Sequence, residues 1–168
     1  MKKIGLFYAT STGNTENMAY KIKEQLADLN ITMHDVATTS DTAIAEYDAL
    51  ILGTSTWGDG DLQDDWEEYI DNLKNAELHG KTVALFGLGD QEEYPDYFLN
   101  AMGTLYEKVS ALGANVVGTW STDGYDFDDS TAVVDDMFVG LALDEDNQDE
   151  LSTERINAWT ESIRTHFE

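Results

Sequence analysis

The chain has 168 residues, no cysteine and a formal net charge of −25 at pH 7. The absence of cysteine excludes disulfides and cysteine-ligated iron–sulfur clusters, and the negative charge argues against nucleic acid and anionic membranes as partners. A chain of this length, with 42% hydrophobic residues, is expected to form one domain over residues 1–168. No stretch is typical of a signal peptide or a membrane-spanning helix, so we expect a soluble cytoplasmic protein.

Short apolar runs alternate with amphipathic runs along the chain. The apolar runs predict strands at 3–9, 31–36, 49–53 and 81–87, and a fifth strand that starts at 115. Apolar side chains spaced three and four residues apart predict helices at 13–29 and 63–74, a third between Pro95 and Gly113, and a last one from Ser152. The Asp-rich segment 121–140 lacks periodicity, and 141–143 is again apolar. This alternation is typical of a doubly wound α/β fold with a parallel sheet between helices.

The turn between the first strand and the first helix is rich in hydroxyl groups. Four of its six residues carry a hydroxyl and none is charged, in the order Thr10-Ser11-Thr12-Gly13-Asn14-Thr15. Free backbone N–H groups and the helix dipole at such a turn favour a phosphate. The turn lacks the Lys of a Walker loop and the three glycines of a dinucleotide turn. We therefore predict a phosphate site here, although Thr and Asn also serve as ordinary helix caps.

Two further loops carry aromatic residues and also leave the carboxyl ends of predicted strands. Trp57 lies in the loop 54–61, and Tyr94 lies in the loop 88–97. In parallel α/β sheets the carboxyl ends share one edge, where ligands bind. The three loops are therefore expected to meet, and a flat ligand with a phosphate tail would suit all of them. The simpler alternative is that Trp57 and Tyr94 make ordinary hydrophobic contacts.

The order of these motifs resembles that of the long-chain flavodoxins. After the hydroxyl-rich turn come Thr56-Trp57, Gly89-Asp90-Gln91 with Tyr94, the segment Ser121–Tyr125, and the segment Phe138–Gln148. The resemblance covers essentially the whole chain and is most specific toward its carboxyl end. It implies a flavodoxin-like doubly wound sheet of five parallel strands with helices on both faces. The segment 121–140 falls where long-chain members carry an insertion that splits the fifth strand.

The resemblance implies a low-potential one-electron carrier with non-covalently bound FMN, which passes between oxidised, semiquinone and hydroquinone states. By position, the phosphate would be held by Thr10, Ser11, Thr12, Gly13, Asn14 and Thr15. Trp57 and Tyr94 would stack on the two faces of the flavin. Its N5 edge would face Gly58, Asp59 and Gly60, with the Gly58–Asp59 peptide turning over on reduction. The pyrimidine edge would face Gly89 and Asp90, and the ribityl chain Asp146. The expected set also includes Thr56, Leu88 and Tyr97, of which the last two differ from what some members carry.

Other functions remain open from the residues alone. An NAD(P)H-dependent quinone or FMN reductase could use the same fold, but no Lys or Arg lies in the three loops to bind a phosphorylated nicotinamide. A phospho-acceptor signalling domain would need paired acids where Thr10 and Ser11 stand. We expect no metal site, because the three histidines are scattered. The acidity should lower the last reduction potential of FMN. It should also attract redox proteins with basic docking faces, such as an NADPH-dependent flavoprotein reductase. We expect the chain to be a monomer.

Overall fold

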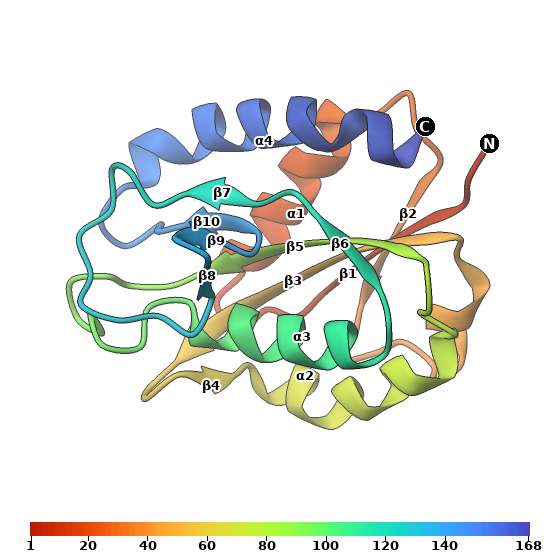
Figure 1. Ribbon diagram of the computed structural model, residues 1–168, viewed down its shortest axis with the longest axis horizontal. Coiled ribbons are helices and arrows are strands. Elements are labelled where there is room, and N and C mark those ends of the chain that lie inside the picture. Colours follow the sequence, from red (N-terminus) through yellow and green to blue (C-terminus); the bar gives the residue numbers. More distant parts are fainter.

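The computed structural model describes residues 1–168 and is organised around one parallel sheet (Figure 1). Its strand order is β10-β5-β3-β1-β2. The bounds are β1 (Ile4–Tyr8), β2 (Ile31–Asp35), β3 (Ala49–Trp57), β5 (Thr82–Leu88) and β10 (Leu141–Leu143). All of these strands run parallel to their neighbours. The predicted doubly wound parallel sheet is confirmed.

Helices cover both faces of the sheet, as predicted. Figure 1 shows α1 (Asn14–Gln25) and α4 (Ser152–Phe167) on one face, with α2 (Asp64–Tyr69) and α3 (Asn100–Ala111) on the other. Short 3-10 helices complete the chain: η1 (Ala43–Glu46), η2 (Ile70–Ala76) and η3 (Asp149–Leu151). No helix is both long enough and apolar enough to span a membrane.

Each face of the sheet has its own hydrophobic core because side chains alternate along a strand. In β3, Leu50 and Leu52 pack with Trp66 on the side of α2 and α3. Their neighbour Ile51 packs with Trp159 on the side of α1 and α4. This is why the central strands are apolar along their whole length rather than at every second residue.

The fifth strand is split by an insertion, as the resemblance implied. Its first half, β6 (Asn115–Val117), pairs with the start of β5, and its second half, β10, pairs with the end. Residues 118–140, called the insertion from here on, contain a small antiparallel sheet. Its strands are β7 (Trp120–Ser121), β8 (Val133–Val134) and β9 (Met137–Phe138).

Several boundaries differ from the sequence prediction. β3 continues to Trp57 instead of ending at residue 53, because β4 (Asp61–Leu62) folds back and pairs with its last residues. The third helix starts at Asn100 and not at Pro95, since the Pro95 carbonyl accepts the N–H groups of Asp128 and Asp129 in the insertion. α1 ends at Gln25, and the predicted helix 63–74 tightens into a 3-10 helix after Tyr69.

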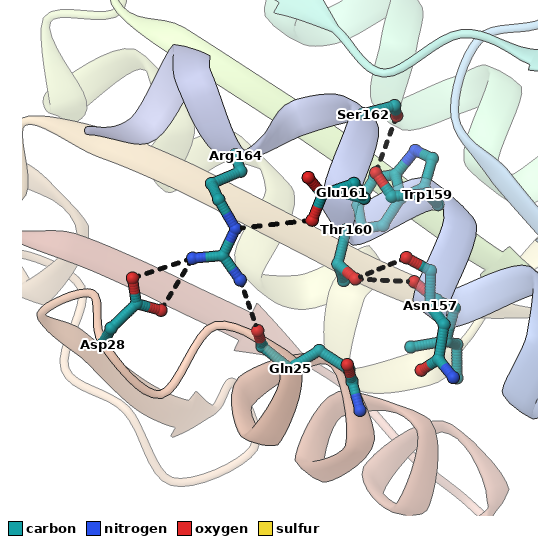
Figure 2. Close-up of polar contacts among 9 residues, drawn as sticks. Gln25, Asp28, Asn157, Trp159, Thr160, Glu161, Ser162 and Arg164 are labelled. Carbon is teal, nitrogen blue, oxygen red and sulfur yellow. Dashed lines mark hydrogen bonds and ion pairs between the residues drawn. The ribbon is translucent and has the colours of Figure 1, made fainter.

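Helix α4 is tied to the end of α1 by one arginine, drawn in Figure 2. The Arg164 guanidinium donates to the Asp28 carboxylate at 2.7 and 2.8 Å and to the Gln25 carbonyl at 2.7 Å. Because Gln25 is the last residue of α1, Arg164 satisfies a carbonyl that has no partner within that helix. The contact joins the two helices that cover the same face of the sheet.

Candidate functional site

A cleft of about 360 Å³ opens at the carboxyl edge of the sheet. The last residues of β3 and the segments that follow β1, β5 and β10 contribute its walls. This is the edge at which doubly wound sheets bind ligands, and its volume lies in the usual range for small-molecule sites. The lining residues are Thr12, Asn14, Thr15, Ser55, Thr56, Trp57, Leu88, Gly89, Asp90, Glu93, Tyr94, Glu145 and Asp146.

The hydroxyl-rich turn leaves backbone donors free at the start of α1. Gly13 precedes the helix with a φ of +92°, and its N–H donates to the Thr10 hydroxyl at 2.9 Å. The N–H groups of Asn14, Thr15 and Glu16 donate to no protein group. The turn therefore presents unpaired donors at the positive end of a helix dipole, as an anion site requires.

Two aromatic side chains border the cleft and remain open to solvent. Trp57 is 42% exposed and Tyr94 is 38% exposed, although large aromatic side chains usually bury most of their surface. The Trp57 indole N–H donates to the Ser55 hydroxyl at 2.8 Å, which fixes the ring at the end of β3. The Tyr94 N–H donates to the Asp90 carbonyl at 3.0 Å, which closes the loop after β5.

A buried carboxylate, Asp144, joins the loops that follow β5 and β10. Its side chain accepts the Gln91 N–H at 3.1 Å and the Gln91 amide at 2.7 Å. It also accepts the N–H groups of Asp146 and Asn147 at 3.2 and 3.0 Å. The Asn147 amide in turn donates to Asp90 at 2.8 Å. Asp144 is fully buried, so it holds these two loops together without lining the cleft.

The cleft is strongly acidic. Asp90, Glu93, Glu145 and Asp146 all line it, and no Lys, Arg or His does. Burial, followed by the charges of Asp90 and its other acidic neighbours, raises the pKa of Asp146. A negative charge that develops in this cleft would therefore meet an unfavourable potential, apart from the donors at the start of α1.

Most of the predicted site residues meet in this cleft. Ten of the seventeen line it: Thr12, Asn14, Thr15, Thr56, Trp57, Leu88, Gly89, Asp90, Tyr94 and Asp146. Thr10 and Gly13 shape the turn from within, and the Ser11 hydroxyl accepts the Gln63 amide at 3.1 Å. Gly58, Asp59 and Gly60 form the turn between β3 and β4 just beyond Trp57. Tyr97 is exposed but does not line the cleft.

Sequence reasoning missed four residues of this region. Ser55, Glu93 and Glu145 line the cleft, and Asp144 organises it. If β3 had been predicted to continue to Trp57, Ser55 would have been placed near the carboxyl end of that strand, where the cleft lies. Glu93 and Glu145 are next to the predicted residues Tyr94 and Asp146 in the sequence. Asp144 follows the apolar run 141–143 directly, but an acid in that position gives no sign of burial in so acidic a sequence.

Comparison with known proteins agrees with this geometry. The family model described as "Flavodoxin" matches residues 6–159. A flavodoxin from a Nostoc species is 48% identical over 166 residues, which cover 99% of this chain and 98% of the relative. Flavodoxin 1 of Escherichia coli is 45% identical over 160 residues, covering 95% and 91% of the two chains.

A solved structure is also similar over the whole length. The crystal structure of Fusobacterium nucleatum flavodoxin bound to flavin mononucleotide has a TM-score of 0.94 and 34% identity, and it covers 100% of both chains. The similarity in sequence and in fold therefore extends over nearly the whole chain. The chain belongs to the flavodoxin family.

Proposed function

We propose that the cleft binds FMN non-covalently and that the chain is a low-potential carrier of single electrons. The observation that carries this proposal is the combination, in one cleft, of unpaired helix N–H donors with two solvent-exposed aromatic rings. Such a cleft suits a planar ring with a phosphate tail. Flavodoxins are electron-transfer proteins, and the related Fusobacterium protein was crystallised with flavin mononucleotide.

Each part of the cleft has a separate task in this proposal. The turn Thr10–Thr15 holds the phosphate with neutral donors, so that no cation offsets the negative charge of the cleft. Trp57 and Tyr94 clasp the ring and exclude water from its faces. Leu88, Gly89, Asp90 and Asp146 also line the cleft; in this proposal the first three would border one edge of the ring, and Asp146 would serve the chain between ring and phosphate.

When bound, FMN supplies the one-electron chemistry, and the protein sets how readily it accepts charge. An acid about 10 Å from the ring opposes a negative charge there by roughly 1.7 kcal/mol at an effective dielectric constant of about 20. Asp90, Glu93, Glu145 and Asp146 all line the cleft. Their combined field therefore lowers the potential of the last reduction step, and salt weakens the effect.

The partners in this proposal are redox proteins with basic docking faces, such as an NADPH-dependent flavoprotein reductase. Acids gather in the loops at the cleft end of the molecule, whereas Lys2, Lys3 and Lys81 precede β1 and β5 at the other end. A charge distribution of this kind turns the cleft toward a basic partner during diffusion. We further propose that the whole chain, 1–168, acts as one FMN-binding domain and as a monomer, in the cytoplasm.

Three measurements test this function. The purified chain should show the visible absorbance of a bound flavin, or should take up added FMN with quenching of its fluorescence. It should accept electrons in two separate one-electron steps during a reductive titration. It should also show negligible turnover with NADPH alone, since no Lys or Arg lines the cleft to bind a nicotinamide phosphate. A chain that refuses FMN would contradict the proposal.

A further inference from the structure

The turn that leads away from Trp57 rests directly on the first residue of α3. Gly60 closes this turn, since its N–H donates to the Trp57 carbonyl at 3.1 Å. Gly60 has a φ of +95°, and a β-carbon placed on it would lie 2.8 Å from the β-carbon of Asn100 and 2.9 Å from its Nδ2. Such distances are too short for non-bonded atoms, so the Asn100 side chain fills the space beside Gly60.

The insertion holds Asn100 from its other side. The Thr131 N–H donates to Oδ1 of Asn100 at 2.8 Å, and the Thr131 hydroxyl donates to the Asn100 carbonyl at 3.4 Å. The preceding residue, Ser130, donates its hydroxyl to the Phe98 carbonyl. A β-carbon at Gly103 would lie 2.6 Å from the Thr131 hydroxyl oxygen, so the insertion packs closely on the first turn of α3.

The start of α3 is also fixed to the sheet. Leu99 precedes the helix in the left-handed region, with a φ of +59°, and its side chain provides no cap. The cap comes from β3 instead, because the Ala101 N–H donates to the Thr56 hydroxyl at 3.2 Å. The start of α3 is therefore held between β3 and the insertion, and the Asn100 side chain packs against the turn at Gly60. No hydrogen bond joins Asn100 to that turn, so the contact acts by steric support.

We propose that Asn100 is a positioning residue for the Trp57–Gly60 turn, and that the insertion supports the turn by holding the Asn100 carboxamide in place. Trp57 lines the cleft, so the mobility of this turn determines how closely the Trp57 side chain packs on a bound ring. This functional consequence rests on the proposed binding of FMN. The support of the turn by Asn100 does not.

Hydrogen exchange at the Gly60 N–H, measured by NMR on the full chain as purified, tests the support. We expect Asn100→Ala to speed this exchange roughly two- to tenfold, the change implied by losing the Thr131–Asn100 hydrogen bond that holds the supporting side chain, with no change at Leu6 in β1. Asn100→Ser cannot reach Thr131 and carries the same expectation if the alanine variant does not fold. Asn100→Asp keeps an oxygen for the Thr131 N–H and should preserve protection. Thr131→Ala is the matched control: it keeps the backbone N–H that donates to Asn100, so exchange at Gly60 should stay as in the wild type.

The result that overturns the proposal is equally specific. Wild-type exchange at Gly60 in both truncated variants would show that Asn100 does not support the turn. Equal acceleration at Leu6 would also overturn it, because the effect would then be a general loss of stability.

The functional part has its own readout in the two one-electron potentials of the bound flavin. Asn100→Ala should change their separation, whereas Asn72→Ala, which removes an amide that donates to Asp41 and does not line the cleft, should not. An unchanged separation with faster exchange at Gly60 would overturn the functional consequence. A chain that binds no FMN would contradict the proposed function, and the exchange experiment would still decide the role of Asn100.

Discussion

Asp144 is a fully buried acid that forms no ion pair with any Lys, Arg or His. Its oxygens are satisfied by hydrogen bonds alone, from two backbone N–H groups of its own loop, from the Asn147 amide, and from the backbone and amide of Gln91. These donors all converge on one side chain. They also lose their acceptor together when the side chain is removed.

We therefore expect Asp144→Ala to lower the free energy of unfolding by about 3 kcal/mol, since it strands several buried donors. Urea unfolding at neutral pH measures this change. Asp149→Ala is a suitable control, because Asp149 is exposed and its side chain bonds no other group; its effect should stay within about 0.5 kcal/mol. Equal losses in the two variants would contradict the role of Asp144.

His34 gives the stability of the protein a pH dependence of known sign. Its ring stacks on Phe7 with centroids 4.7 Å apart and shares a hydrogen bond with the Tyr47 hydroxyl. Burial lowers the pKa of His34 below its ordinary value. The unfolded chain then binds the proton more readily than the folded one, so this contribution to stability is present above about pH 6.5 and is lost as the pH falls.

The comparison of wild type with His34→Gln isolates the pH-dependent contribution of His34 to stability. Loss of carboxylate charge at low pH relieves repulsion in both proteins and so cancels in the difference. We expect the stability difference, wild type minus variant, to shrink between about pH 7.5 and about pH 5.5, as measured by urea unfolding at each pH. A difference that stays constant over this range would show that His34 titrates normally in the folded state.

At the scale of elements, the start of α3 depends on a side chain from another element. Because the Thr56 hydroxyl of β3 caps the Ala101 N–H, Thr56→Val should lower the free energy of unfolding by about 1 kcal/mol, as the loss of a helix cap does. Thr56→Ser retains the hydroxyl and should restore most of the loss. Chemical denaturation of the three proteins tests this. A serine variant as unstable as the valine variant would indicate lost packing instead.

The turn between β3 and β4 is the element closest to the expected N5 edge of the flavin. Gly58 has a φ of +50°, which a valine rarely adopts. Since the flavodoxin resemblance implies that the Gly58–Asp59 peptide turns over on reduction, Gly58→Val should narrow the separation of the two one-electron potentials.

Spectroelectrochemical titration measures that separation. Gly80→Val is a matched control, because Gly80 also has a positive φ, +77°, and has open space around it away from the cleft. The control should reproduce the backbone strain and leave the potentials unchanged. The prediction would be wrong if both variants kept the wild-type separation.

At the scale of the whole molecule, the net charge of −25 should govern encounter with basic partners. Electrostatic steering weakens as salt shortens the screening length from about 10 Å at 0.1 M to about 3 Å at 1 M. We expect the second-order rate constant of electron transfer from a basic flavoprotein reductase to fall at least tenfold over this range of salt. Stopped-flow kinetics would measure it. A rate that does not respond to salt would place the docking contacts outside the acidic loops.

The sequence determined the fold class, because hydrophobic periodicity records which faces of each element are buried. The continuous apolar runs in β3 and β5 indicated strands covered on both sides, and the order of elements left only a parallel sheet as a simple solution. The same rule placed the hydroxyl-rich turn, Trp57 and Tyr94 at one edge. The split of the fifth strand came from resemblance, since 121–140 carries no periodic signal of its own.

Only the tertiary structure decided how the loops are held. The side chain of Asp144 is buried because donors from two loops converge on it, and Asn100 matters because Gly60 and Thr131 meet there. These contacts join residues about 30 to 50 positions apart through hydrogen bonds and close approaches. Polar contacts of this kind leave no periodicity in a sequence, and in so acidic a chain a buried Asp looks like its solvated neighbours.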